Sequence, residues 1–296
     1  MSLFEGLFQG ILQGLTEFLP VSSSGHLSLF QHLFGLSGTH AVFFDVLLHV
    51  GTLLAVFIAY WKTIWLMIVE FFGMVGDVFK GRFKYRECNE ERKMVLMVLL
   101  TLVPLLAFYF IKDHITALSE DADIIVEGVC FLFTGTMLLL ADKCVKGRKT
   151  AVDMTPRDAL RIGLFQGIAS LPGVSRSGST VSIGLLSGYS REFMVKFSFI
   201  MGIPAIMGAS LSEIKDAAQE GLSVTMPMIV GMVAALIVGI AAIKLLTWLV
   251  KTDRFGVFAY YTLILGVIVL IIGIIEHVAG NDIVTLATSL FNQGVK

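Results

Sequence analysis

Six apolar runs, each long enough to cross the roughly 30 Å hydrocarbon core of a bilayer, restrict this chain to a membrane fold. Backbone polar groups find no water in lipid, so a run of this length must form a helix that satisfies its own hydrogen bonds. The composition agrees, because 56% of the 296 residues are hydrophobic and only 15% are charged. We predict an all-α integral membrane protein with six transmembrane helices, at 42–60, 94–112, 124–141, 193–213, 227–250 and 257–279.

A further apolar segment, 62–79, carries Lys62, Glu70 and Asp77 among its hydrophobic residues. We interpret it as an extension of the preceding helix or as a helix that lies in the membrane interface. If it spanned the membrane instead, the two halves of the chain described below would be parallel rather than inverted.

Lysine and arginine are concentrated in the connections 80–93 and 143–161, whereas the loops 112–123 and 214–226 are poor in cations and contain acidic residues. Cytoplasmic loops of membrane proteins carry an excess of positive charge. We therefore place 80–93 and 143–161 in the cytoplasm and both termini outside. The whole chain has a net charge of -1, which gives no bulk attraction for nucleic acid.

The sequence repeats itself, without gaps, at an offset of 153 residues. The stretch "QGLTEFLPVSSSGH" from Gln13 aligns with "QGIASLPGVSRSGS" from Gln166. Three predicted spans lie between the two copies, and an odd number of spans gives the copies opposite orientations in the membrane. We predict a single membrane domain made of two inverted repeats, 1–152 and 153–296, each with one hairpin and three spans.

Each aligned motif interrupts an apolar segment with proline, glycine and serine. Non-helical backbone at membrane depth is tolerated only where protein buries it or where it lines a wet cavity. We predict two re-entrant helix-loop-helix hairpins, one at about 3–34 that enters from outside and one at about 158–190 that enters from the cytoplasm. Their tips should meet near the centre of the bilayer.

The two tips have the features of an anion site. Pro20 and Pro172 end the first half-helix of each hairpin, because proline has no amide proton and disfavours helix in the residue before it. The serines that follow lie at the start of the second half-helix, where free N–H groups and the helix dipole attract anions. Two such ends facing each other suit a diphosphate. The predicted substrate-binding residues are Gln13, Ser22, Ser24, Ser175, Ser177 and Thr180.

The tips also differ in ways that suit phosphoryl transfer, which needs a nucleophile, an acid or base and neutralisation of charge. Ser23 aligns with Arg176, so one tip has a hydroxyl where the other has a cation. Glu17 and His26, which are suited to proton transfer, align with plain serines. We predict that these four residues are catalytic. Gln13 lies four residues before Glu17, so both can offer oxygens to a hard cation, Mg²⁺ or Ca²⁺.

Other polar residues lie within or near the predicted spans. Asp45 and His49 have i,i+4 spacing, and they either support the site from behind or pair with each other. Glu127, Lys244 and Glu276 lie closer to span ends or are isolated, and we expect them to reach the interface by snorkelling.

The segments "QGLTE" and "FLPVSSSGH" at 13–26, together with "PGVSRSGST" at 172–180, resemble the signature pair of the bacterial undecaprenyl pyrophosphate phosphatases of the bacitracin-resistance type. The flanks "FFDVLLHVGTLLAV" and "REFMVKFSFIMGIPAIMGA" are similar to this family too, so the resemblance covers essentially the whole chain. It implies hydrolysis of undecaprenyl pyrophosphate to undecaprenyl phosphate and inorganic phosphate, which recycles the lipid carrier for cell-wall synthesis and confers bacitracin resistance. It also implies dependence on a divalent cation, a bacterial inner membrane location and an active site open to the outer face.

The resemblance leaves the attacking group open among Ser23, His26 and a water molecule that His26 activates. Gln13 is a less secure site residue, because a neutral amide cannot replace a carboxylate as a base or a charged metal ligand. Carried over onto this sequence, the family's catalytic set is Glu17, Ser23, His26, Ser175, Arg176 and Thr180.

A polyprenyl-phosphate flippase or transporter is the competing prediction, because inverted repeats with broken helices at mid-membrane are typical of alternating access. An intramembrane serine protease would leave Arg176 and the paired anion sites without a role. The expected partners are therefore a polyprenyl diphosphate lipid and the bilayer, and the sequence is compatible with an oligomer as well as a monomer.

Overall fold

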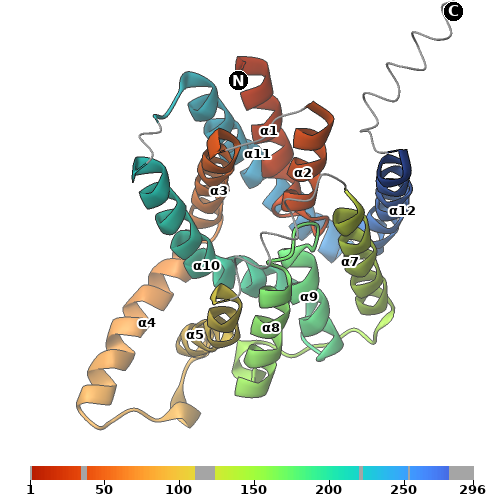
Figure 1. Cartoon of the computed structure of the whole chain (residues 1–296). Helices are drawn as coiled ribbons and strands as arrows, with labels where there is room; N and C mark the ends of the chain where they lie inside the picture. Colours follow the sequence, from red (N-terminus) through yellow and green to blue (C-terminus); the bar gives the residue numbers. More distant parts are fainter. Residues whose placement is uncertain (1, 35–38, 111–123, 220–222, 253, 280–296) are drawn as a thin grey trace, which may run out of the picture.

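Helices form the described part of the chain. The computed structural model describes residues 2–34, 39–110, 124–219, 223–252 and 254–279. These ranges contain eleven α-helices and no β-strand beyond an isolated bridge, so the all-α prediction is confirmed (Figure 1). The helices are α1 (Leu3–Thr16), α2 (Ser23–Phe34), α3 (Thr39–Ala59), α4 (Trp61–Phe79), α5 (Glu90–Tyr109), α7 (Ile125–Lys143), α8 (Pro156–Ile168), α9 (Arg176–Leu186), α10 (Arg191–Gln219), α11 (Met226–Lys251) and α12 (Gly256–Ala279).

The long helices fall where the spans were predicted. A helix covers nearly all of each predicted span, except that residues 111 and 112 lie outside the described part of the chain. Four helices, α7, α10, α11 and α12, are each long and apolar enough to cross a membrane, and α3 with α4 forms a fifth candidate as a bent pair. The fold is thus that of a multi-pass membrane protein, and the full number of six spans stays a prediction.

The charged segment 62–79 forms a separate helix, α4, which is bent by 85° from α3 at Tyr60. It therefore does not extend α3 in a straight line. Arg92 of α5 donates to Glu70 at 2.9 Å and to Asp77 at 2.8 Å, so the neighbouring helix neutralises two of the charges that interrupt the segment. Beside α5, α4 projects away from the rest of the molecule (Figure 1).

Glycines bring each hairpin close to a long helix from the other half of the chain. Gly10 of α1 lies so near Gly231 of α11 that a Cβ at position 10 would overlap the carbonyl of Gly231. Gly163 of α8 has the same relation to the carbonyl of Thr101 in α5. Positions 10 and 163 are related by the 153-residue offset. Close approach of this kind is how helices gain packing energy where lipid supplies no hydrophobic drive.

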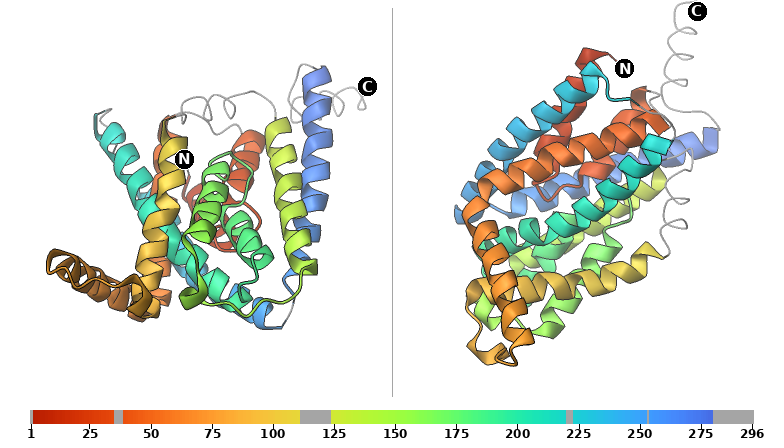
Figure 2. Two further views of the ribbon diagram at one scale, coloured as in Figure 1. Left: turned by 90° about the horizontal axis from the view of Figure 1, so that it is seen from below. Right: turned by 90° about the vertical axis from the view of Figure 1, so that its left-hand side faces the viewer.

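Two helices, α7 and α12, close one side of the molecule around the hairpins (Figure 2). Gly128 of α7 packs on Leu270 of α12, and Gly135, which lies later in α7, packs on Leu263, which lies earlier in α12. The pair is therefore antiparallel.

Prolines interrupt both hairpins, as predicted. The N–H of Leu19 makes the last helical bond, to the carbonyl of Leu15, and Pro20 has no N–H with which to continue the helix. In the second hairpin, the last helical bond runs from the N–H of Ala169 to the carbonyl of Phe165, and a turn bond from Leu171 to Ile168 follows just before Pro172. The two breaks place the α1–α2 and α8–α9 hairpins together in the middle of the bundle (Figure 2).

Candidate active site

The two hairpin tips touch each other through equivalent serines. Ser24 Oγ accepts a hydrogen bond from the N–H of Gly173 at 3.4 Å, and Ser177 Oγ donates to the carbonyl of Leu19 at 3.5 Å. Ser24 and Ser177 are related by the 153-residue offset, so each tip reaches the backbone of the other with the same residue. Each of these predicted substrate-binding serines thus lies where the two breaks meet.

Ser22 and Ser175, which are also related by the offset, build the starts of α2 and α9. Ser22 Oγ accepts from the N–H of Gly25 at 3.2 Å, and Ser175 Oγ accepts from the N–H of Gly178 at 3.0 Å. Both hydroxyls therefore act as helix caps. Ser22 has φ 72°, which is a left-handed backbone conformation. This conformation costs about 1 to 2 kcal/mol for a residue with a side chain. It turns the chain so that α2 begins at Ser23.

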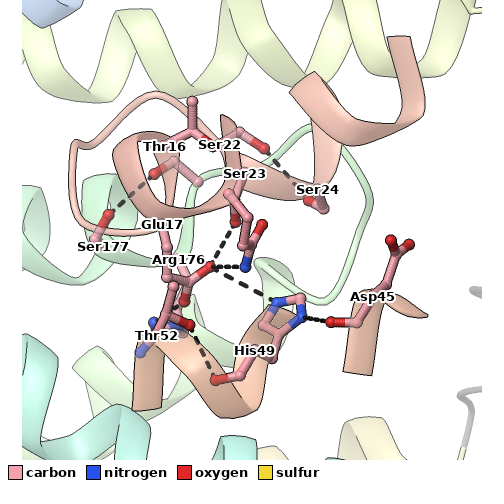
Figure 3. Close-up of polar contacts among 12 residues, drawn as sticks. Thr16, Glu17, Ser22, Ser23, Ser24, Asp45, His49, Thr52, Arg176 and Ser177 are labelled. Atoms are coloured by element: carbon pink, nitrogen blue, oxygen red, sulfur yellow. Dashed lines mark hydrogen bonds and ion pairs between the residues drawn. The ribbon is translucent and has the colours of Figure 1, made fainter. Parts of the chain in front are cut away.

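Glu17 is the centre of the site, and its carboxylate is buried. Its Oε1 accepts from Arg176 Nη2 at 2.5 Å, and its Oε2 accepts from Ser23 Oγ at 2.6 Å and from Gln13 Nε2 at 3.1 Å (Figure 3). Glu17 caps the end of α1, while Ser23 and Arg176 are the first residues of α2 and α9. One carboxylate therefore joins a hydroxyl and a cation at the starts of the two second half-helices.

His49 of α3 also reaches this carboxylate. Its Nε2 lies 3.7 Å from Glu17 Oε2, and its Nδ1–H donates to the backbone carbonyl of Asp45 at 2.8 Å (Figure 3). The carboxylate of Asp45 instead accepts from Gln31 of α2 at 3.1 Å. Thus His49 lies at the site, whereas Asp45 holds α2 and bonds to His49 only through its backbone.

His26 is turned toward α12. Its Nδ1–H donates to the carbonyl of Ser22 at 2.7 Å, which leaves Nε2 to accept from the Tyr261 hydroxyl at 2.7 Å. The two rings are nearly parallel, at 8°, with centroids 5.8 Å apart. Within the described residues no hydrogen bond or ion pair joins His26 to Glu17. The sequence did not point to Tyr261, which lies in an apolar stretch.

Thr180 and Gly202 shape the space around Arg176. Thr180 Oγ1 donates to the carbonyl of Arg176 at 2.8 Å and lies 2.7 Å from Ser198 Oγ of α10, so it fixes α9 against α10. Gly202 faces the guanidinium, and a Cβ at this position would overlap Arg176 Nη1. At the 153-residue offset Gly202 aligns with His49, just as Arg176 aligns with Ser23. The first half therefore combines the small Ser23 with the long His49, whereas the second half combines the long Arg176 with Gly202.

Glu127 and Glu276 do not snorkel, because both are buried and bind α2. Glu127 Oε1 accepts from Ser28 Oγ at 2.8 Å, and Glu276 Oε1 lies 2.9 Å from His32 Nε2. The expectation was wrong because the partners of these carboxylates come from a helix some 100 to 240 residues away in sequence. Together with Asp45, they hold the second helix of the first hairpin in place.

The residues near Glu17 offer one oxygen that has no partner. Gln13 Oε1 is buried and accepts no hydrogen bond from any described residue, whereas both oxygens of Glu17 already accept bonds. The described residues contain no cluster of three or more His, Cys, Asp or Glu that could hold a metal ion by itself. A cation here would therefore need most of its ligands from a substrate or from water. Mg²⁺ is commonly bound in this way, by one or two protein oxygens and the phosphates of its substrate.

Known proteins are similar to this chain over nearly its whole length. Residues 6–268 match the family model described as bacitracin resistance protein BacA. A curated protein from Alkaliphilus metalliredigens (strain QYMF), named undecaprenyl-diphosphatase, is 41% identical over 279 residues, which cover 93% of this chain and 100% of the relative. Proteins of the same name from Halothermothrix orenii and Methanosphaera stadtmanae are 36% and 35% identical, covering 92% and 88% of this chain and 98% and 94% of the relatives. The similarity therefore includes both hairpins.

Proposed function

The chain belongs to the family of the bacitracin resistance protein BacA, and we propose that Glu17, Ser23 and Arg176 carry out its reaction. It is an undecaprenyl-diphosphatase, a membrane hydrolase that converts undecaprenyl pyrophosphate to undecaprenyl phosphate and inorganic phosphate. Recycling of this lipid carrier is consistent with the bacitracin resistance in the family name. The observation that carries the residue assignment is the Glu17 carboxylate, which binds Ser23 through one oxygen and Arg176 through the other.

The diphosphate binds between the starts of α2 and α9. Free backbone N–H groups at these two helix starts, together with the positive ends of their dipoles, attract the phosphate oxygens. Arg176 keeps one buried nitrogen, Nη1, without a hydrogen-bond partner among the described residues. A planar guanidinium suits phosphate oxygens, so Arg176 is the side chain that we assign to the diphosphate. The polyprenyl chain stays in the surrounding lipid.

Ser23 is the nucleophile and Glu17 is its general base. Ser23 Oγ attacks the terminal phosphorus while its proton passes to Glu17 Oε2, which already accepts its hydrogen bond at 2.6 Å. The bond from that phosphorus to the bridging oxygen breaks, and undecaprenyl phosphate leaves with the oxygen. Water then hydrolyses the phosphoserine, which releases inorganic phosphate and restores the serine. A positioned base of this kind contributes about 10² to 10⁴ in rate.

Trapping the intermediate tests the choice among Ser23, His26 and water. With substrate labelled in its terminal phosphate, rapid acid quenching should leave label on wild-type protein, because phosphoserine survives acid, and none on Ser23→Ala. Peptide mapping should place the label on Ser23. An acid-labile, alkali-stable label that persists in Ser23→Ala would identify His26 instead, and full turnover by Ser23→Ala would indicate attack by water.

Phosphate release in detergent micelles separates the enzyme from the competing flippase or transporter. The paired packing of the two hairpins, α1 on α11 and α8 on α5, is the observation that favours a transporter-like architecture. A micelle has no second leaflet, so a pure flippase would release no phosphate from a polyprenyl diphosphate, whereas the phosphatase should turn it over.

A divalent cation, Mg²⁺ or Ca²⁺, completes the site in this proposal. Gln13 Oε1, the unpartnered buried oxygen, and the Glu17 carboxylate would hold it together with substrate oxygens. When bound, the ion neutralises part of the charge on the diphosphate.

Chelation should therefore lower phosphate release by at least about a hundredfold, and added Mg²⁺ or Ca²⁺ should restore it. Gln13→Ala should raise the metal concentration needed for half-maximal activity by about tenfold, with most of the activity recovered at saturating metal. Metal titrations of both proteins at fixed substrate measure the shift. Activity that chelator leaves unchanged would exclude the ion, and an unshifted titration in Gln13→Ala would exclude Gln13 as its ligand.

The orientation in the membrane completes the proposal. We propose six spans and two inverted re-entrant hairpins, with the site open to the outer face of a bacterial inner membrane. Three observations support the spans and the hairpins. A helix lies at each predicted span, α4 runs at 85° to α3 as an interfacial helix would, and the hairpins pack on opposite halves at positions 153 residues apart.

A further inference from the structure

Tyr261 of α12 and Phe131 of α7 both pack on the imidazole of His26. The Tyr261 ring lies nearly parallel to the imidazole, at 8°, with the centroids 5.8 Å apart, whereas the Phe131 ring is perpendicular to it, at 87° and 5.3 Å. Offset-stacked and edge-to-face arrangements are the favoured geometries of aromatic pairs. The Tyr261 hydroxyl also lies 2.7 Å from His26 Nε2. The α7–α12 pair therefore fixes both the position and the orientation of this imidazole.

The hydrogen bonds of His26 assign its tautomer. Nδ1 lies 2.7 Å from the carbonyl of Ser22, which can only accept, so we assign the proton to Nδ1. In the neutral imidazole Nε2 then has a lone pair, to which the Tyr261 hydroxyl donates. Because Tyr261 occupies this lone pair, the arrangement does not present Nε2 to Ser23 as a base. The N–H of the ring instead binds the backbone of the hairpin.

The Ser22 carbonyl belongs to the turn that precedes α2. Ser22 has φ 72°, and a residue with a side chain keeps such a conformation only where surrounding contacts hold it. Two donors of His26 reach the Ser22 carbonyl, the backbone N–H at 3.2 Å and the Nδ1–H at 2.7 Å. The imidazole of His26 therefore stabilises this turn directly.

Ser23 follows the turn, so the direction of its side chain depends on the backbone of Ser22. Its Oγ lies 2.6 Å from Glu17 Oε2. A series of contacts thus begins on α12 and ends at the proposed nucleophile, from the Tyr261 hydroxyl through His26 and the Ser22 carbonyl to Ser23. Displacing a catalytic group by about 1 Å can cost about 10² in rate, so a residue at the far end of this series can influence the reaction.

We propose that Tyr261 is a positioning residue of the phosphatase, which acts through His26 and the Ser22 carbonyl to hold Ser23 beside Glu17. This inference rests on the proposed role of Ser23 as the nucleophile. It gives His26 a part in positioning Ser23 rather than in proton transfer.

Tyr261→Phe tests the proposal, because it keeps the ring and removes only the hydroxyl. It should lower kcat by about tenfold, the effect of one lost hydrogen bond, and leave KM within about twofold, because the groups that bind the diphosphate are untouched. Tyr260→Phe is the matched control. It removes the same hydroxyl from the next, exposed residue of α12, which points about 100° away, and it should leave kcat unchanged. Phosphate release in micelles measures both variants, and equal kcat values for the two would overturn the proposal.

Two substitutions of His26 separate positioning from proton transfer. The amide of asparagine occupies the place of Nδ1–H and can still donate to the Ser22 carbonyl, whereas the amide of glutamine occupies the place of Nε2. Neither amide is a base. If His26 acts by positioning, His26→Asn should keep kcat within about tenfold of wild type, and His26→Gln should lose about a hundredfold. Equally large losses in both variants would assign proton transfer to Nε2 and overturn the proposal.

A double-mutant cycle shows whether Tyr261 acts through His26. His26→Asn has no group at the place of Nε2, so Tyr261→Phe should change kcat by less than about twofold in that background. A tenfold loss in both backgrounds would mean that Tyr261 acts through the packing of α12. The role of Ser23 is decided separately, by rapid-quench labelling of the wild-type protein. Absence of label on Ser23 would overturn the nucleophile, whereas additive effects of Tyr261→Phe and His26→Asn would overturn the positioning role of Tyr261.

Discussion

Replacing Glu17 by glutamine is expected to lower kcat for phosphate release by at least about a thousandfold. A neutral amide cannot take the proton of Ser23, whose hydroxyl donates to Glu17 Oε2 at 2.6 Å. It also removes the charge that balances Arg176, which lies 2.5 Å from Glu17 Oε1. Loss of one partner of a largely buried ion pair is unfavourable, so a lower melting temperature should accompany the lost activity. Steady-state phosphate release in micelles, at saturating substrate, measures the effect.

Two variants make this result specific to the site. Glu17→Asp keeps the charge but shortens the side chain, and should recover part of the activity. Glu70→Gln removes a carboxylate that also pairs with an arginine, Arg92, but on α4, away from the hairpin tips, and should keep kcat within about twofold. If Glu17→Gln retained more than a tenth of wild-type kcat while folded, Glu17 could not be the base that Ser23 needs.

The sequence predicted the parts of this fold that depend on neighbouring residues. The breaks in the hairpins follow from Pro20 and Pro172, because a missing N–H acts on the residues next to it. Ser22 and Ser175 could be placed at helix starts for the same reason. The repeat extended this reasoning across 153 residues, since it identified two equivalent tips before any contact between them was known.

Contacts that depend on how helices pack against each other were beyond the sequence. His49 and Asp45 lie one helical turn apart on the same face of α3, yet only His49 reaches Glu17, because the position of α3 along its own axis decides which of the two is level with that carboxylate. The sequence predicts snorkelling for Glu127 and Glu276, since nothing near them in sequence shows that Ser28 and His32 of α2 bind them.

The repeat contains a further signal about which residues face each other. The alignment that sets Arg176 against Ser23 also sets Gly202 against His49, so the gain of a long side chain in one half coincides with the loss of another nearby. The structure brings Gly202 against Arg176, which gives the exchange a steric reason. An internal repeat can therefore identify residues that face each other, through paired changes in side-chain volume.

Gly202→Ala is accordingly expected to lower kcat/KM by at least about a hundredfold, although it adds a single methyl group. That methyl group would overlap Arg176 Nη1, so the guanidinium must leave its place beside Glu17. A displacement of about 1 Å in a catalytic group can cost about 10² in rate. Gly208→Ala is the matched control on the same helix, because a Cβ there would meet no atom within 4 Å, and it should leave the kinetics unchanged.

A double-mutant cycle distinguishes displacement of Arg176 from general disruption of α10. Arg176→Lys removes Nη1, the atom that the added methyl group would meet, and lowers activity by itself because lysine cannot replace the planar fork. In the Arg176→Lys background, Gly202→Ala should lower kcat/KM by only about twofold. The effects of the two substitutions on kcat/KM should therefore be far from additive, as is typical for residues in direct contact. A full hundredfold loss in both backgrounds would mean that Gly202 acts through the packing of α10 rather than through the position of Arg176.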